Sequence, residues 1–132
     1  MKTLLIAGLT SLVLASTAVA GNTSQKSTYT QMTGQEIKSA LVGNSLRGVD
    51  RSGKYVIHYS SDRKMKIVYN KKRIESGVWR IKGNKYCRRW AKLGGGKERC
   101  VTFHRNGNKI VWVQTGKITD HSVLLRGNPA RL

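Results

Sequence analysis

The segment that most constrains the fold of this chain is residues 77–100, which holds both cysteines and two of the three tryptophans. Alternating residues flank a Gly83-Asn84 turn in this segment, and a run of three glycines precedes Cys100. Two cysteines allow only one intramolecular pairing, so we expect a Cys87–Cys100 disulfide, which would stabilise the domain by roughly 3 kcal/mol. A free-thiol nucleophile or metal ligand is the alternative, and the lack of Cys-x-x-Cys spacing disfavours it.

The N-terminus has the pattern of a secretory signal. Lys2 precedes an apolar stretch at residues 4–14, and Ala18-Val19-Ala20 is a small-x-small cleavage sequence. The apolar stretch is shorter than the roughly 20 residues that span a bilayer, and no later segment is apolar enough to be transmembrane. We therefore expect export to the periplasm or the medium after cleavage following Ala20, into conditions in which the disulfide can form.

Composition divides the remainder into a short leader and one domain. Residues 21–32 are polar and are expected to be a flexible leader. Residues 33–132 are enough for a single domain and too few for two.

A helix is expected at residues 34–42, at the start of this domain. Thr33 and Glu36 have the spacing of a capping box, and Met32 and Ile37 have that of a hydrophobic staple. Gly43 is a typical C-terminal stop. We expect this helix to lie as a lid or plug against a sheet.

From residue 46 onward, apolar residues follow a period of two that turn residues interrupt, which predicts antiparallel strands. The expected strands are residues 46–50, 54–60, 64–70, 74–82, 85–90, 98–105, 110–115 and 118–126. About eight such strands favour a small up-and-down barrel or a strongly curled meander sheet, because closure removes exposed edges. The predicted fold class is therefore mainly β, with one short N-terminal helix and one disulfide; a two-sheet sandwich is the alternative.

Several of these motifs also occur together in a known group. Gly77-x-Trp79, Cys87-x-x-Trp90, Cys100 and a closing Gly127-Asn128-Pro129 resemble a group of small exported proteobacterial domains of unknown function. The resemblance covers roughly residues 33–132 and implies a periplasmic, barrel-like domain. Because its motifs are structural, it implies no activity.

Charge gives the clearest indication of a partner. Lys and Arg number 25 against 6 Asp and Glu, a formal net charge of +19, and such a surface attracts polyanions. If the strands pair in chain order, five basic residues share the outward face: Lys64, Lys66, Arg80, Lys82 and Arg88. We expect this patch to bind lipopolysaccharide, anionic lipid headgroups or nucleic acid. The alternative is a solvated face that only keeps the protein soluble.

Two aromatic residues have the same strand parity as Arg88. Tyr86 and Trp90 would therefore lie on the patch, where they could stack on a ligand. The alternative is that they pack in the core or against the disulfide.

No catalytic constellation stands out. His58, His104 and His121 fall on three different expected strands without metal-binding spacing, and no two carboxylates suggest acid–base chemistry. We therefore expect a non-catalytic binding protein without metal or cofactor. A secreted hydrolase, foremost a nuclease using two of the histidines, is one alternative. A protein-interaction module or enzyme inhibitor that presents the loop at residues 93–97 is the other.

Overall fold

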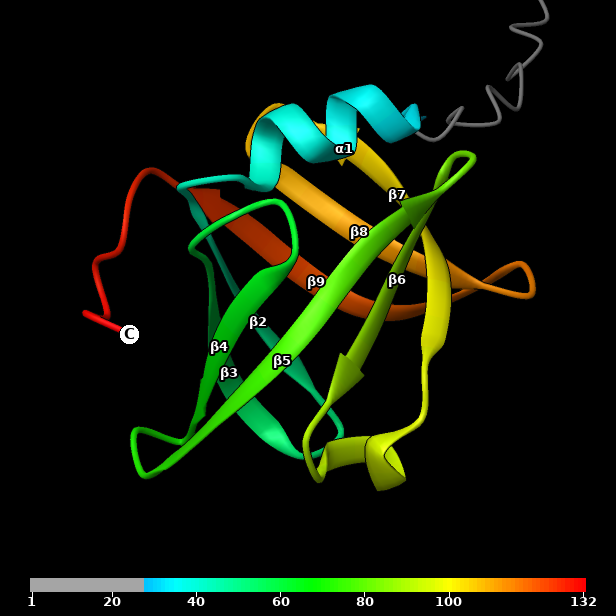
Figure 1. The fold of residues 1–132 in the computed structure, drawn as a ribbon. Coiled ribbons are helices and arrows are strands. Elements are labelled where there is room, and N and C mark those ends of the chain that lie inside the picture. The colour runs from blue at the N-terminus through cyan, green and yellow to red at the C-terminus, as the bar shows by residue number, and fades with distance from the viewer. Residues whose placement is uncertain (1–27) are drawn as a thin grey trace, which may run out of the picture.

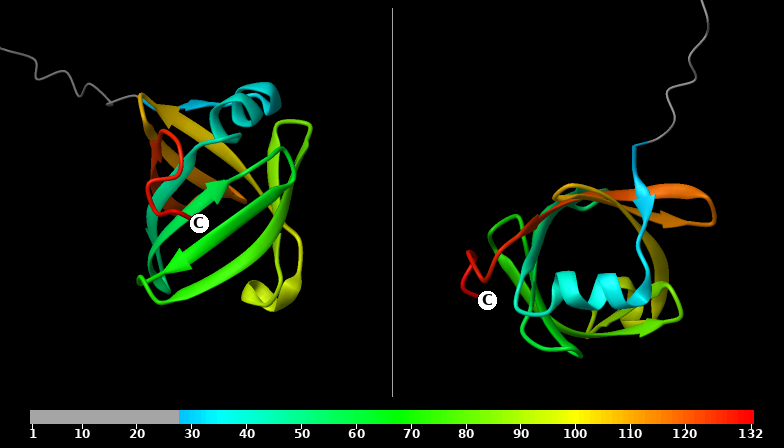
Figure 2. Two further views of the ribbon diagram at one scale, coloured as in Figure 1. Left: turned by 60° about the vertical axis from the view of Figure 1, so that its left-hand side comes forward. Right: turned by 90° about the horizontal axis from the view of Figure 1, so that it is seen from above.

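The computed structural model describes residues 28–132, which form a closed antiparallel β-barrel with a helix across one end (Figures 1 and 2). The elements are β1 (Thr30–Gln31), α1 (Gly34–Leu41), β2 (Ser45–Asp50), β3 (Gly53–Tyr59), β4 (Lys64–Tyr69), β5 (Arg73–Lys82), β6 (Lys85–Trp90), the short 3-10 helix η1 (Leu93–Gly96), β7 (Arg99–Asn106), β8 (Lys109–Gln114) and β9 (Lys117–Leu125). Strands β2 to β9 pair in chain order, and β9 pairs back with β2. The expected eight-stranded up-and-down barrel is thus confirmed.

Helix α1 closes one end of the barrel, as the view along the barrel in Figure 2 shows. Its capping box is formed: the Thr33 hydroxyl accepts from the Glu36 amide at 3.2 Å, and the Glu36 carboxylate accepts from the Thr33 amide at 2.7 Å. Ile37 and Leu41, four residues apart on one face, are completely buried. The helix is therefore fixed both by its cap and by its packing into the barrel end.

The flexible leader predicted for residues 21–32 is wrong for its last residues. Strand β1 pairs with β7, and the Met32 amide donates to the Phe103 carbonyl at 2.8 Å. Met32 is buried in the core, and this apolar contact holds the otherwise polar segment in place. The predicted signal sequence and residues 21–27 lie outside the described residues. Within the described part of the chain, no helix is long and apolar enough to cross a membrane.

Aromatic side chains fill the barrel at the helix end. Tyr86 stacks on Phe103 with ring centroids 4.8 Å apart, and it meets Tyr59 and Trp112 edge-on. The Tyr59 and Tyr86 hydroxyls hydrogen-bond to each other at 3.0 Å, so these buried polar groups are satisfied. The alternative of a core position for Tyr86 and Trp90 is correct, because both are buried inside the barrel.

The disulfide Cys87–Cys100 is present, and it joins directly opposite positions of β6 and β7. It lies on the outer side of the sheet, beneath an ion pair. Arg80 donates to the Glu98 carboxylate through Nε at 2.9 Å and Nη2 at 2.7 Å, and that carboxylate lies within 4.8 Å of both sulfurs. Arg80 is therefore already paired within the chain.

Gly77 of the first tryptophan motif makes room for the ring of Trp90 in the second. Gly77 and Trp90 are cross-strand partners, and a Cβ at position 77 would lie 2.4 Å from the Trp90 ring and 2.9 Å from the Arg89 carbonyl oxygen. The indole thus packs over bare backbone, which only glycine allows.

We expect Gly77→Ala to destabilise the protein by about 1–3 kcal/mol, because the ring and a backbone carbonyl would both have to move. Guanidinium chloride unfolding measures this loss. Ser76→Ala, on the exposed side of the same strand, is the matched control and should stay within about 0.5 kcal/mol of the wild type. An equal loss in both variants would contradict the packing explanation.

Candidate ligand-binding cavity at the open end of the barrel

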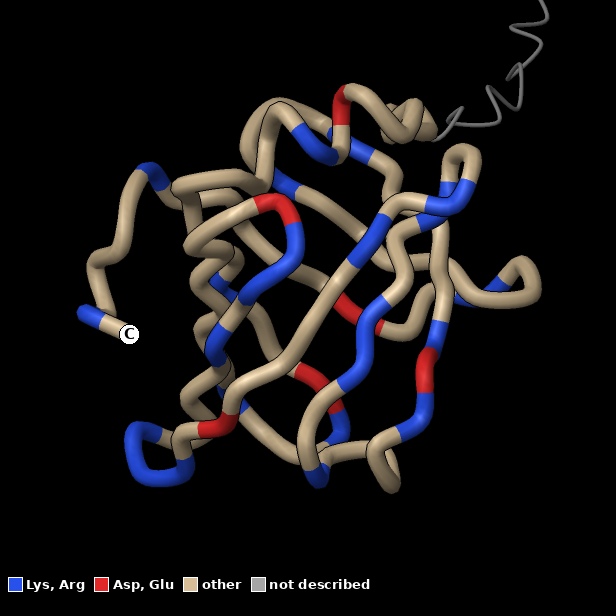
Figure 3. The backbone as a smooth tube through the Cα atoms, in the orientation of Figure 1, with Lys and Arg blue, Asp and Glu red and all other residues tan. Residues whose placement is uncertain are grey.

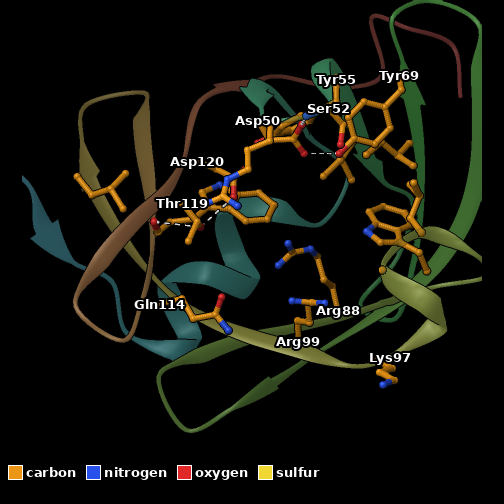
Figure 4. Close-up of a pocket in the computed structure, with 18 of the residues that line it drawn as sticks. Asp50, Ser52, Tyr55, Tyr69, Arg88, Lys97, Arg99, Gln114, Thr119 and Asp120 are labelled. Carbon is orange, nitrogen blue, oxygen red and sulfur yellow. Dashed lines mark hydrogen bonds between the residues drawn. The ribbon is translucent and has the colours of Figure 1, made fainter.

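The end of the barrel opposite α1 opens into a cavity of about 650 Å³ (Figure 4). Its walls come from the turns β2–β3 and β8–β9, the η1 segment and residues of β3, β4 and β6 to β9. A volume of this size is typical of small-molecule sites. The apolar and aromatic part of the lining is Tyr55, Ile57, Ile67, Tyr69, Trp90, Leu93, Trp112 and Ile118.

Arg88 is the central cation of this cavity. Its cross-strand partner is Trp79, a core residue, so Arg88 faces inward. Its guanidinium carbon lies 4.7 Å from the centre of the Trp112 ring, a cation–π contact. Its Nη1 is buried and has no hydrogen-bond partner among the described residues. The expectation that Arg88 shares an outward basic patch is therefore wrong, because this position follows the parity of the core.

Tyr55 presents a second buried group without a partner. Only 3% of its surface is exposed, and its hydroxyl makes no hydrogen bond to the described residues. The hydroxyl lies over Gly48, where a Cβ would come within 2.5 Å of it, so the glycine makes room for the phenol. Burial raises the pKa of Tyr55 far above its ordinary value, with Asp120 as the next cause. The phenol therefore stays neutral and can donate or accept a hydrogen bond.

Two carboxylates lie across the cavity from Arg88 and Arg99, as Figure 4 shows. Asp50 is satisfied locally, because it accepts from the Ser52 amide at 2.7 Å and from the Tyr69 hydroxyl. Asp120 is buried, and its carboxylate accepts from the Thr119 hydroxyl at 3.0 Å.

Burial raises the pKa of the Asp120 carboxyl above its ordinary 3.8, against the hydrogen bond from Thr119 and the attraction of Arg88. Neither of the two ion pairs among residues 28–132 includes Asp120 or Arg88. Both charges therefore face the cavity without a partner of opposite charge at ion-pair distance.

A buried carboxylate holds one side of the mouth in shape. Glu75 accepts from the amides of Lys92 and Leu93, the residues that lead into η1. Gly94, with φ of 62°, and the two glycines after it, all with positive φ, make the tight turn that follows. The loop at residues 93–97 is thus anchored next to the cavity.

The other residues of the predicted basic patch do lie outside the barrel. Lys64, Lys66 and Lys82 are exposed on β4 and β5, while Arg80 binds Glu98. Basic positions are spread along strands and turns and far outnumber acidic ones (Figure 3). The structure thus brings the lysines onto one outer face and separates Arg88 from them.

The three histidines expected on separate strands do lie on β3, β7 and β9. His104 and His121 both pair with Val111, so one strand separates them by roughly 9.5 Å between backbones. His58 lies on β3 and hydrogen-bonds to Ser45 at 3.1 Å. None of the three lines the cavity.

A single cluster of potential metal ligands occurs within residues 28–132. It consists of Cys87, Glu98 and Cys100. Its two sulfurs are joined in the disulfide, so they are not thiolate ligands.

Comparison of the chain with family models, with curated proteins and with solved structures finds no match. The resemblance to exported proteobacterial domains stays a prediction from motifs. Any inference about function therefore rests on the cavity and the charges of this chain.

We expect Asp120→Asn to raise the free energy of unfolding at pH 7 by about 0.5–2 kcal/mol, the range common for stabilising single substitutions. The reason is that the folded state holds the Asp120 carboxylate with a raised pKa. The advantage of the variant should shrink as the pH falls through that raised pKa toward 3.8, because protonation then removes the same charge from the wild type. Denaturant unfolding between about pH 3.5 and 7.5 measures both effects.

Asp62→Asn is the control, since Asp62 is exposed and pairs with Lys38 at 3.8 Å. It should change stability by no more than about 0.5 kcal/mol. A loss of stability in Asp120→Asn at pH 7 would show that the carboxylate has a structural partner.

Proposed function

We propose that this protein is a non-catalytic binding protein that takes a small molecule with an anionic group into the open end of its barrel. The observation that carries this proposal is the Arg88 guanidinium, which faces a large cavity with a buried nitrogen that has no partner among the described residues. Leaving such a donor unsatisfied costs roughly 1–3 kcal/mol or more, so an anionic ligand that satisfies it gains this energy on binding.

The surroundings of Arg88 support an anionic group combined with an apolar part. Arg51, Lys97, Arg99 and Lys117 line the mouth, and their charges favour the entry and orientation of an anion. Farther in, Trp90 and Trp112 offer aromatic surface for a ring or an alkyl group. A few convergent polar groups set in apolar walls are the usual composition of a small-molecule site.

Export is part of the proposal. It rests on the signal pattern of residues 1–20 and is supported by the Cys87–Cys100 disulfide, a bond typical of oxidising compartments. The ligand would then be a component of the cell envelope or of the medium.

Two residues on one strand allow a matched test. Arg88 faces the cavity and the adjacent Arg89 is exposed on the outside. With 8-anilinonaphthalene-1-sulfonate as the probe anion, we expect Arg88→Gln to weaken binding about 10- to 100-fold, the loss of one charge-assisted interaction. Arg89→Gln should bind like the wild type. Dye fluorescence at fixed ionic strength gives both dissociation constants.

Equal weakening in the two variants would mean that the dye responds only to net charge. Unchanged binding in Arg88→Gln would remove the cavity as the site. Unfolding curves of both variants show whether a lost signal reflects lost folding.

A second candidate is docking of the outer face of β4 and β5 on an anionic lipid surface. Lys64 and Lys66 are exposed there without an acidic partner among the described ion pairs, and the apolar Ile74 and Val78 are exposed beside them on β5. Basic and apolar groups side by side suit the boundary between lipid headgroups and acyl chains. Lipopolysaccharide and anionic phospholipid share this chemistry; nucleic acid is less favoured because, among the described residues, no exposed aromatic side chain lies on this face.

We expect vesicles with anionic phospholipid to bind the protein at low salt, and Lys64→Glu with Lys66→Glu to weaken this binding at least about tenfold, since each lysine contributes roughly 1 kcal/mol near such a surface. Co-sedimentation measures the bound fraction. Lys109→Glu with Arg126→Glu, the same charge change elsewhere, is the control. An equal loss of vesicle binding in both double variants would mean that binding depends on overall charge and not on the outer face of β4 and β5.

A further inference from the structure

We propose that the ligand of the cavity is a zwitterion, whose carboxylate binds Arg88 and whose ammonium group binds Asp120, with an apolar or aromatic part against the inner walls. This inference rests on the proposed function, because it names the ligand class of the same site. It is carried by two opposite charges that face one cavity and do not pair.

Arg88 and Asp120 both line the cavity, and neither takes part in an ion pair among the described residues. If these two charges only stabilised the fold, we would expect them to form an ion pair. A charge in a partly desolvated interior is unfavourable when no opposite charge compensates it. Here the guanidinium has a buried nitrogen without a partner in the described chain, and the carboxylate accepts from the hydroxyl of the neighbouring Thr119. A ligand with both charges would compensate both groups at once.

The structure holds the two groups apart around a common side chain, Trp112. The Arg88 guanidinium lies over the Trp112 ring, and Asp120 is the cross-strand partner of Trp112 on β9. The β8–β9 register shifts immediately after this pair, between Trp112 and Val113, and the Thr119 hydroxyl donates to the Asp120 carboxylate there. Arg88 and Asp120 are therefore positioned by separate contacts, Arg88 by the Trp112 ring and Asp120 by the Thr119 hydroxyl.

The other polar groups fit the same assignment. Asp50 already accepts two hydrogen bonds, which leaves Asp120 as the carboxylate with more free acceptor capacity. Tyr55 lines the same cavity, and its hydroxyl, which has no partner among the described residues, is a further donor or acceptor there. Arg99 lines the same wall as Arg88 and adds positive charge there.

The pair of charges also discriminates between ligand classes. A simple carboxylate would satisfy Arg88 but would be repelled by Asp120, and a simple amine would meet the reverse situation. A zwitterion satisfies both groups. The inner walls add Ile57 and Ile67, which suit an apolar substituent such as a phenyl ring.

Three compounds with one carbon skeleton test this inference. Phenylalanine carries both charges, 3-phenylpropionate lacks the ammonium group and phenethylamine lacks the carboxylate. We expect phenylalanine to displace 8-anilinonaphthalene-1-sulfonate at a concentration at least about tenfold lower than either analogue needs, one charge-assisted contact being lost in each. Titration calorimetry with phenylalanine provides a dissociation constant without the dye.

The variant Asp120→Asn tests the proposed contact between the Asp120 carboxylate and the ammonium group of the ligand. It should weaken phenylalanine binding at least about tenfold, and it should leave 3-phenylpropionate binding unchanged or tighter, because repulsion between two carboxylates is removed. Arg88→Gln should weaken the binding of both compounds. Asp62→Asn, an exposed acid away from the cavity, should match the wild type for every compound.

The two proposals fail in different ways. If 3-phenylpropionate binds as tightly as phenylalanine and Asp120→Asn changes neither, the zwitterion inference is overturned while the anion site at Arg88 stands. If the dye binds through Arg88 and no compound of the three displaces it, the inference is likewise overturned. If the dye does not depend on Arg88, the proposed function itself fails.

Discussion

Pairing of β9 with β2 closes the sheet, and this closure determines what the interior can hold. A barrel of about eight strands encloses a space just wide enough to be filled by side chains or to admit a small ligand. At the α1 end, Ile37, Leu41 and the aromatic cluster fill that space. At the other end the short η1 segment only borders the opening, and the inward positions there include charged groups.

Along the barrel axis, the inward side chains change from aromatic or neutral to charged, and this change can be seen within a single strand. On β6, Tyr86 is completely buried in the aromatic cluster, whereas Arg88, two residues farther, reaches the cavity. On β9, Ser122 accepts from the Trp112 indole at 3.0 Å, and Asp120 lies two residues closer to the mouth. Such charges lower stability unless they are compensated, so their presence in the interior favours a site kept for binding.

The strand pattern and the cysteine count are enough to predict the barrel, its helix and its disulfide, because each depends on local spacing. The inward position of Arg88 is also within reach of the sequence. A two-residue Gly83-Asn84 turn sets Lys82 opposite Lys85, and continuing that register places Arg88 opposite the core residue Trp79. The prediction is wrong because it takes a charged residue to face outward.

Other features depend on long-range geometry that local patterns do not contain. The placement of Asp120 in the same cavity as Arg88 follows from closure of the barrel and from the register shift on β8 and β9. Likewise, Glu75 has no role in the sequence pattern, yet it binds the amides that lead into η1. These arrangements bring together residues from different elements of the barrel, and they decide the shape and charge of the cavity.

The basic outer surface responds to the net charge of a partner, whereas the cavity responds to how charges are arranged within a ligand. A zwitterion carries no net charge, so the strongly basic surface would orient it at the mouth more than it would attract it. Binding in the cavity should therefore depend only weakly on ionic strength, because buried charges are screened little. Docking of the outer lysines on an anionic surface would depend on it steeply. The excess of basic residues thus fits a role in placing the protein, and the few charges inside the barrel fit a role in selecting what it binds.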